Sequence, residues 1–255
     1  MFQVAAEAYD AYMGRWSAPL APAFTDLAGV APGDRVLDVG CGPGALTGHL
    51  RTLLGPGAVA AVDPAEPFVA AVRARVPDVD ARVASADALP FPDDAFDAAL
   101  AQLVVHFMPD PVAGVREMAR VTRPGGRVAA CVWDHAEGSG PLAPFWRAVH
   151  EADPGADDES GRHGTGRGQL TGILEAAGLA DVVEHRLTVE LAFADVEEWW
   201  RPFTLGVGPG GTYVAQLDER ARAGLRQACA RLLPVDPFRL AGSAWAAVGA
   251  VRPTG

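Results

Sequence analysis

The stretch from Val36 to Gly44, with the sequence VLDVGCGPG, most constrains how this chain can fold. Apolar residues lead directly into a turn that contains three glycines. Gly40, Gly42 and Gly44 have no Cβ, so the backbone can turn sharply there and a ligand can approach the main chain closely. Residues 45–54 are predicted to form a helix. A strand, a glycine turn and a helix in this order are typical of nucleotide-binding sites.

Strand-like and helix-like segments alternate along the chain on both sides of this turn. The predicted strands are 35–39, 57–62, 80–84, 97–103, 126–133, 181–191 and 243–251. The predicted helices after the turn are 45–54, 65–76, 112–121, 169–177 and 217–233. This alternation predicts an α/β fold with a mostly parallel sheet and helices on both faces.

Four further motifs accompany the glycine turn. Asp38 precedes the first glycine by two residues, Asp63 ends the second predicted strand, Asp87-Ala88 follows the third, and Arg123-Pro124-Gly125-Gly126 precedes the fifth. As a set, these motifs resemble the class I S-adenosylmethionine-dependent methyltransferases, especially small-molecule enzymes similar to the ubiquinone and menaquinone methyltransferases. The resemblance covers residues 9–134. It implies a Rossmann-like sheet of seven strands whose last strand is antiparallel, a helical cap, and S-adenosyl-L-methionine as cofactor.

The family pattern also suggests a division of the chain. Residues 1–30 are expected to form an N-terminal helical cap, which Pro19 and Pro22 should break in two. Residues 31–195 and 236–255 are expected to form the cofactor-binding methyltransferase domain. Because the last two strands form a hairpin in this family, residues 196–235 are interpreted as a helical substrate-lid insertion. The polar stretch 134–168 is expected to be a mobile connection or part of a lid.

The resemblance implies that the glycine turn holds the amino acid end and the ribose of the cofactor through Gly40, Cys41 and Gly42. Asp38 is expected to orient the cofactor ammonium, although an aspartate here could simply cap the turn. Asp63, followed by Pro64, can accept hydrogen bonds from both ribose hydroxyls. The alternative for Asp63 is an N-cap of the next helix.

The remaining cofactor contacts are expected from four segments. Asp87 and Ala88 are expected to bind the adenine, and Gln102 lies at the strand end that flanks the sulfonium in this family. Tyr9 and Arg15 could contact the cofactor carboxylate from the N-terminal cap. An amphipathic helix that only docks on the sheet would explain these last two residues equally well.

His106 is the first candidate for a catalytic residue, because it follows the fourth predicted strand. It could equally be a packed core histidine. His135 and Tyr213 are further candidates for a general base. The aromatic side chains of residues 196–235 suggest an apolar or aromatic small-molecule acceptor, or else they fill the seam between lid and sheet. No paired histidine and carboxylate motif in the sequence indicates a metal site.

Composition narrows the function classes. The net charge is −11, so the phosphate backbone of a nucleic acid would be repelled and nucleic acid is an unexpected substrate. Three cysteines at wide spacing argue against a disulfide framework and favour a cytoplasmic location. No apolar run approaches the roughly 20 residues of a membrane span, and no targeting segment is expected at the N-terminus. The protein is expected to be a monomer or a homodimer.

Two rival functions share the glycine turn. A nicotinamide-dependent reductase of the short-chain type needs a Tyr-x-x-x-Lys pair, and this chain contains no lysine. A catalytically inactive methyltransferase-like protein could bind the cofactor and act as a regulatory subunit. Release of S-adenosylhomocysteine in the presence of an acceptor would distinguish an enzyme from such a binding protein.

Overall fold

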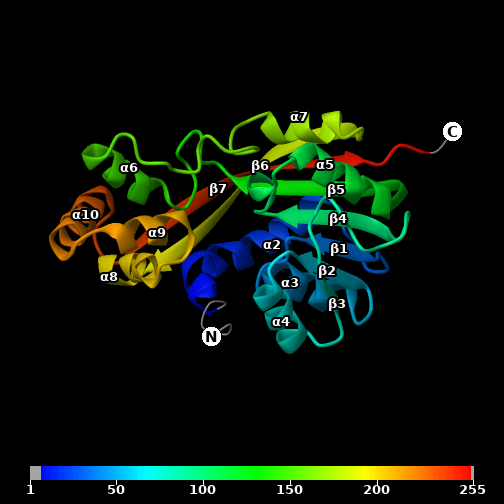
Figure 1. The fold of residues 1–255 in the computed structure, drawn as a ribbon, viewed down its shortest axis with the longest axis horizontal. Helices are drawn as coiled ribbons and strands as arrows, with labels where there is room; N and C mark the ends of the chain where they lie inside the picture. Colours follow the sequence, from blue (N-terminus) through cyan, green and yellow to red (C-terminus); the bar gives the residue numbers. More distant parts are fainter. Residues whose placement is uncertain (1–6, 254–255) are drawn as a thin grey trace.

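A computed structural model describes residues 7–253 of the chain. Its sheet has the order β3-β2-β1-β4-β5-β7-β6 (Figure 1). The strands are β1 (Val36–Val39), β2 (Val59–Asp63), β3 (Asp80–Val83), β4 (Phe96–Gln102), β5 (Thr122–Trp133), β6 (Ala180–Phe193) and β7 (Phe238–Ala250). Strands β1 to β5 pair in parallel, and β7 runs antiparallel to both β5 and β6. The predicted sheet of seven mostly parallel strands with an antiparallel last strand is confirmed.

Helices cover both faces of the sheet (Figure 1). Before β1 lie η1 (Asp10–Gly14) and α2 (Arg15–Leu27). Between β1 and β6 lie α3 (Ala45–Leu54), α4 (Glu66–Arg75), η2 (Val105–Phe107), α5 (Pro111–Val121), α6 (Ala143–Ala152) and α7 (Gln169–Ala176). Between β6 and β7 lie α8 (Val196–Trp200), η3 (Arg201–Leu205), α9 (Gly208–Gln216) and α10 (Glu219–Leu232). None of the helices described within residues 7–253 is long and apolar enough to span a bilayer.

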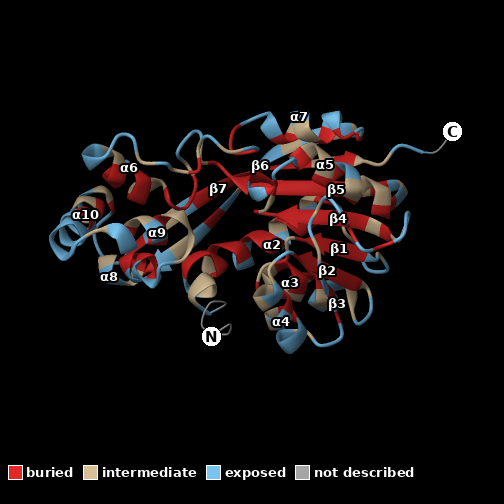
Figure 2. Ribbon diagram, viewed as in Figure 1, coloured by how far each residue is buried: buried red, intermediate tan, exposed pale blue. Residues whose placement is uncertain are grey.

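The alternation of side chains along the central strands creates two separate apolar layers. In β4, Ala98 and Leu100 join the layer that also contains buried residues of α2, α3 and α4, whereas Ala99 and Ala101 join the layer of α5 and α7. Successive side chains of a strand point to opposite faces. The central strands are therefore apolar on both sides, and Figure 2 shows β1, β2 and β4 as almost continuously buried, whereas the edge strands β3 and β6 are largely exposed.

The motif Arg123-Pro124-Gly125-Gly126 lies inside β5, where the sequence predicts a turn into the strand. Thr122 pairs with Phe96, and the next pair is Arg127 with Ala98. The four motif residues therefore oppose a single residue of β4 and bulge out of the ladder. The motif acts as an irregular entry to the strand.

The N-terminal helix differs from the prediction at its prolines. Pro19 and Pro22 lie inside α2, which continues from Arg15 to Leu27 without a break. Both prolines are exposed, while Leu20 and Phe24 on the opposite side are completely buried. Packing of this apolar side offsets the roughly 3 kcal/mol that an interior proline costs a helix. The predicted break is therefore wrong. Residues 1–6 of the expected cap lie outside the described residues.

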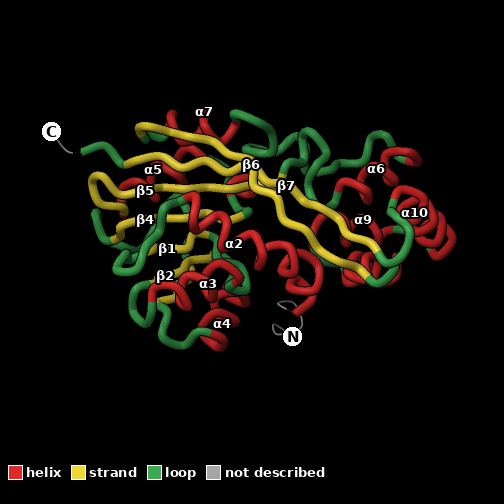
Figure 3. Tube along the Cα trace, turned by 180° about the vertical axis from the view of Figure 1, so that it is seen from behind, coloured by secondary structure: helices red, strands yellow, loops and turns green. Residues whose placement is uncertain are grey.

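The hairpin of β6 and β7 extends well beyond the other strands (Figures 1 and 3). Strand β7 pairs with β5 only through residues 244–250, whereas its pairing with β6 continues from residue 250 to residue 238. The helices α8 to α10 lie at the projecting end, beside α6. Helix α6 falls within the polar stretch 134–168, where the sequence analysis predicts no helix.

Aromatic rings join this helical end to the N-terminal helix. Phe145 of α6 stacks on Phe203 of η3 with ring centroids 4.4 Å apart, and Phe203 also contacts the rings of Tyr12, Trp199 and Trp200. All five rings are buried, none with more than 4% of its surface exposed. We call these five residues the aromatic cluster. It fills the seam between η1, α6 and the consecutive elements α8 and η3, which are three parts of the chain distant in sequence.

Truncation of the fully buried Phe145 ring of this cluster is expected to destabilise the protein. Phe145→Ala should lower the free energy of unfolding by about 3–5 kcal/mol, because it removes a fully buried ring and leaves a cavity. Urea unfolding followed by circular dichroism measures the difference. Val235→Ala, at a position that is 90% exposed, is the matched control and should change stability by less than about 0.5 kcal/mol. Equal stabilities of the two variants would contradict this account of the aromatic cluster.

Candidate active site at the carboxyl ends of the strands

Two adjoining cavities lie at the carboxyl ends of β1 to β4. The larger has a volume of about 300 Å³ and the smaller about 120 Å³. They share four lining residues, Gly40, Pro64, Val104 and Phe107. We call the two cavities together the cleft. Ligands of open parallel sheets bind at this edge, where the chain order reverses, and here β1 lies between β2 and β4.

The glycine turn forms one wall of the larger cavity. Gly40 has a φ of +72°, and a Cβ at this position would lie 2.1 Å from Cγ2 of Val104. No other residue type fits there. Gly42 also has a positive φ, but a Cβ there would meet nothing within 4 Å. Gly44, at a φ of +100°, is the residue that starts α3. The turn therefore needs glycine for close packing at its first position and for backbone conformation throughout.

Asp38 lies one residue before the end of the strand β1 and is 1% exposed. Its Oδ2 accepts a hydrogen bond of 2.6 Å from the hydroxyl of Thr47 in α3. Burial raises the pKa of the carboxyl to about 7, against the opposing effect of the Thr47 hydrogen bond. A cation at this end of the cavity would stabilise the charged form. This is the environment in which a carboxylate gains most from an ammonium ligand.

Asp63, at the end of β2, ties the glycine turn to the start of α4. Its Oδ2 accepts a hydrogen bond of 2.9 Å from the backbone N–H of Gly42, and its Oδ1 accepts one of 2.8 Å from the N–H of Ala65. Burial raises the pKa of Asp63, and the two hydrogen bonds oppose this increase. Each oxygen keeps a second lone pair for a ligand. The carboxylate lines the larger cavity beside Pro64.

Asp87 and Gln102 lie at opposite ends of the cleft. Asp87 lines the smaller cavity, and Gln102 lines the larger one. The amide nitrogen of Gln102 donates a 3.1 Å hydrogen bond to the carbonyl of Ser17 in α2, while its Oε1 is buried without a hydrogen-bond partner. The N–H of Ala88 donates to the carbonyl of Ser85, and Ala88 is not among the residues that line either cavity.

The two candidate residues of the N-terminal cap lie in different places. Tyr9 lines the larger cavity together with Cys41, and its ring packs edge-on against Phe68 of α4. Arg15 instead forms an ion pair of 3.0 Å with Glu198 of α8 and lies over the ring of Phe193. Arg15 therefore contacts the helical end of the molecule, and only Tyr9 lies in the cleft.

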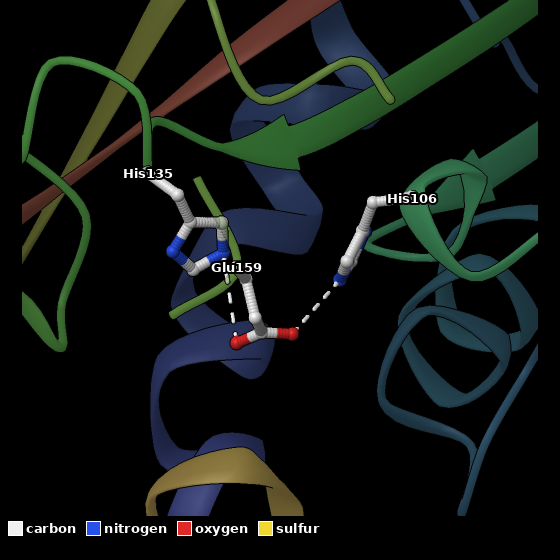
Figure 4. A group of neighbouring side chains, drawn as sticks. All are labelled: His106, His135 and Glu159. Carbon is white, nitrogen blue, oxygen red and sulfur yellow. Dashed lines mark ion pairs between the residues drawn. The ribbon is translucent and has the colours of Figure 1, made fainter. Parts of the chain in front are cut away.

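Beside the cleft, two of the histidines proposed as bases converge on a buried glutamate (Figure 4). His106 comes from η2 after β4, His135 from the loop after β5, and Glu159 from the loop after α6. The Nε2 atoms of His106 and His135 lie 3.7 Å and 3.9 Å from the two oxygens of Glu159. We call these three residues the His–His–Glu cluster. Phe107, next to His106 in the chain, lines the cleft.

The sequence analysis identifies both histidines of this cluster but not Glu159. His106 and His135 follow adjacent parallel strands, and the carboxyl ends of such strands meet at one edge of a sheet. The sequence therefore contains a pattern that places the two histidines at the same edge of the sheet. Glu159 lies in a long polar stretch with several other acidic residues, and no spacing distinguishes it from them.

Burial controls the charge of the His–His–Glu cluster. It lowers the pKa of His106 to about 3 and that of His135 to about 4, so both imidazoles are neutral at neutral pH. Burial also raises the pKa of Glu159 to about 7. The third candidate base, Tyr213, lies elsewhere, with its hydroxyl 3.5 Å from Asp153.

Residues 37–130 match the family model described as a methyltransferase domain. The match runs from β1 into β5 and contains the glycine turn, Asp63, Asp87 and His106. This part of the chain is therefore similar to a methyltransferase domain. The resemblance to class I S-adenosylmethionine-dependent methyltransferases that the sequence predicts is thereby confirmed.

Curated relatives match about half of this chain. An uncharacterized methyltransferase of Schizosaccharomyces pombe is 32% identical over 146 residues, which cover 50% of this chain and 52% of that protein. The demethylmenaquinone methyltransferase of Mycobacterium sp. strain KMS is 44% identical over 103 residues, which cover 40% of this chain and 43% of that protein. The chain thus spans about half the length of the curated relatives it matches.

Solved structures share the fold of this chain over most of its length. A phosphoethanolamine N-methyltransferase of Haemonchus contortus, solved with phosphomonomethylethanolamine and S-adenosylhomocysteine, has a TM-score of 0.59 and 19% identity, and covers 98% of this chain and 57% of that one. An S-adenosylmethionine-dependent methyltransferase of Thermotoga maritima has a TM-score of 0.53 and 16% identity, and covers 96% of this chain and 99% of that one.

The buried carboxyl of Asp38 predicts a specific dependence of stability on pH. The folded protein holds a proton on Asp38 up to about pH 7, whereas the unfolded chain releases it near its ordinary pKa of 3.8. Stability therefore falls as the pH rises through this window, by up to about 4 kcal/mol from this one group. Asp38→Asn removes that contribution but retains an oxygen for Thr47.

Urea unfolding at several values from about pH 5 to about pH 8 measures this effect. The wild type should lose more stability over the range than Asp38→Asn. Contributions from Asp63 and Glu159 are common to both proteins and cancel in the comparison. Identical pH profiles would contradict the assignment of the titration to Asp38.

Proposed function

We propose that this chain transfers a methyl group from S-adenosylmethionine to a small molecule. One observation carries the proposal: Asp38, Asp63 and Asp87 follow or end three neighbouring parallel strands and line one continuous cleft, beside a glycine turn that packs too closely for any side chain. S-adenosylmethionine presents an ammonium, a ribose diol and an adenine amino group. A row of three acceptors matches this series of donors.

The positions of these groups suggest how the cofactor would lie. Asp38 and the glycine turn would receive the amino acid end in the larger cavity, with Tyr9 above it. Asp63 would receive the ribose hydroxyls, since its two oxygens already face the turn and the start of α4. Asp87 would receive the adenine in the smaller cavity. The sulfonium would then lie toward Gln102, near the end of β4.

The chemistry needs positioning more than proton transfer. Methyl transfer from a sulfonium is an in-line displacement that neutralises the positive charge on sulfur, so holding the reactants aligned away from water could contribute roughly 7–11 kcal/mol. A general base would add a factor of about 10² to 10⁴ for an acceptor that must lose a proton. His106 is neutral and close to the cleft, but its lowered pKa makes it a weak base.

The acceptor itself is proposed to be a small molecule with an apolar or aromatic face. Phe107 lines the cleft and is 53% exposed, which supports contact with an apolar group at its mouth. The tryptophans at 199 and 200 offer less support than the sequence suggests, because both belong to the buried aromatic cluster. We propose that residues 31–195 and 236–255 hold the cofactor and that residues 196–235 cover the acceptor side.

Incubation of the protein with S-adenosylmethionine and a panel of small acceptors, followed by detection of S-adenosylhomocysteine, tests the activity. Acceptor-dependent release is expected. Tight binding of S-adenosylhomocysteine with no release for any acceptor would instead favour the inactive cofactor-binding alternative. Absence of binding at millimolar concentration would contradict the proposed function altogether.

Asp63→Ala should weaken binding of S-adenosylhomocysteine about tenfold or more. The variant loses an acceptor for both ribose hydroxyls, and hydrogen bonds to charged groups contribute roughly 1.5–3 kcal/mol. Isothermal titration calorimetry measures the affinity, and circular dichroism checks the fold. Asp26→Ala, at an exposed position of α2, is the control and should bind like the wild type. Unchanged affinity in a folded Asp63→Ala protein would remove Asp63 from the cofactor site.

A further inference from the structure

The His–His–Glu cluster brings three metal-binding side chains together from three separate segments (Figure 4). The side chains of His106, His135 and Glu159 are only 4–6% exposed. One ligand atom from each residue lies within 4.8 Å of the other two. The three side chains point toward a common centre. Their convergence is a property of the fold, since 29 and 24 residues of chain separate them (135 − 106 = 29; 159 − 135 = 24).

The contacts within the cluster are too long for hydrogen bonds. Glu159 lies 3.7 Å from Nε2 of His106 and 3.9 Å from Nε2 of His135, whereas N–H···O hydrogen bonds span about 2.7–3.2 Å. Nε2 of His135 and Nδ1 of His106 are buried without a hydrogen-bond partner among the described residues. A buried carboxylate between two neutral rings is an unfavourable arrangement unless a further group completes it.

The observed separations suit an ion at the centre. Zinc binds imidazole nitrogen and carboxylate oxygen at about 2.0–2.2 Å, which places the ligand atoms of a tetrahedral site roughly 3.3–3.6 Å apart. The distances of 3.7 Å and 3.9 Å run to different oxygens of Glu159 and slightly exceed this range, and the ligand atoms of all three residues lie within 4.8 Å of one another. Small rotations of the side chains would close the site.

We propose that His106, His135 and Glu159 bind a divalent transition-metal ion, with Zn²⁺ as the ion that this donor set fits best. Two imidazoles and one carboxylate are a ligand set of catalytic zinc sites and of non-haem iron sites. This proposal departs from the expectation of no metal site that the sequence alone gives.

The protonation states also suit a metal. Both imidazoles are neutral, as a metal requires, because burial lowers the pKa of each ring. Burial raises the pKa of Glu159, and a dication would stabilise its ionised form.

Charged groups around the cluster are mostly acidic. The positive charge of Arg162 lowers the pKa of all three cluster residues, and it opposes the binding of a cation. The negative charges of Asp134 and Asp158 raise the pKa of His135. Those of Asp157 and Asp158 raise the pKa of Glu159. The local balance therefore favours a divalent cation.

Three protein ligands leave at least one coordination position for water or another oxygen ligand. His135 also lines a separate cavity of about 300 Å³ next to α6, together with Trp146 and Arg147. A small molecule in that cavity could place an oxygen on the ion. This last step rests on the proposed function, whereas metal binding itself does not.

The test is direct titration of the full chain with Zn²⁺ after dialysis against a chelator, in the absence of cofactor and acceptor. Competition with a chromogenic chelator gives the affinity and the stoichiometry, and Co²⁺ in place of Zn²⁺ gives a visible spectrum that reports nitrogen and oxygen ligands. One ion per chain is expected. His135→Gln and Glu159→Gln should each weaken binding at least tenfold, and Zn²⁺ should raise the melting temperature of the wild type but not of these two variants.

His150→Gln is the matched control, because His150 lines the same cavity as His135 and pairs with Asp158 at 3.8 Å but is not part of the cluster. It should bind Zn²⁺ like the wild type. No binding at micromolar Zn²⁺, or equal binding by the cluster variants, would overturn the proposal. Loss of binding in His150→Gln alone would also overturn it and assign the ion to a different site. Failure of methyl transfer would leave each of these readouts unchanged.

Discussion

The hydrogen bonds of Asp63 hold the cleft together. One oxygen binds the glycine turn after β1 and the other binds the start of α4 after β2. Two neighbouring strand ends are thereby fixed relative to each other by one buried carboxylate. A carboxylate out of water is costly unless it is hydrogen-bonded, and the free backbone N–H groups of a turn and a helix start meet that need. The shape of the cavity follows from this constraint.

The cavity edge as a whole concentrates buried acidic groups. Burial raises the pKa of Asp38, Asp63 and Glu159, each of which lacks a basic side chain as a hydrogen-bonding partner. Elsewhere, acidic residues such as Asp97 and Glu117 are paired with arginine and have a lowered pKa. The buried acidic residues thus differ from the arginine-paired ones in their surroundings rather than in residue type. Shifted pKa values of this kind are typical of functional sites.

Much of the fold and part of the cleft could be predicted from the sequence, because they depend on local patterns. An apolar strand followed by glycine or aspartate marks a strand end wherever it occurs, and this placed Asp38, Asp63 and Asp87 on one edge. The break at Pro19 was wrong because burial of Leu20 and Phe24 decides that helix. The partner of Arg15 could not be predicted, since Glu198 lies in a helix carried by the long hairpin. Glu159 was missed for the same reason: its neighbours are set by tertiary contacts.

The contact between Gly40 and Val104 links the glycine turn to the residues that follow β4. A side chain at position 40 would overlap the valine, and the positive φ there adds a second barrier. Any bulkier residue at position 40 would require a smaller one at position 104. Across a set of related sequences, these two positions should therefore covary, and the surface loops far from the cleft should change independently of both.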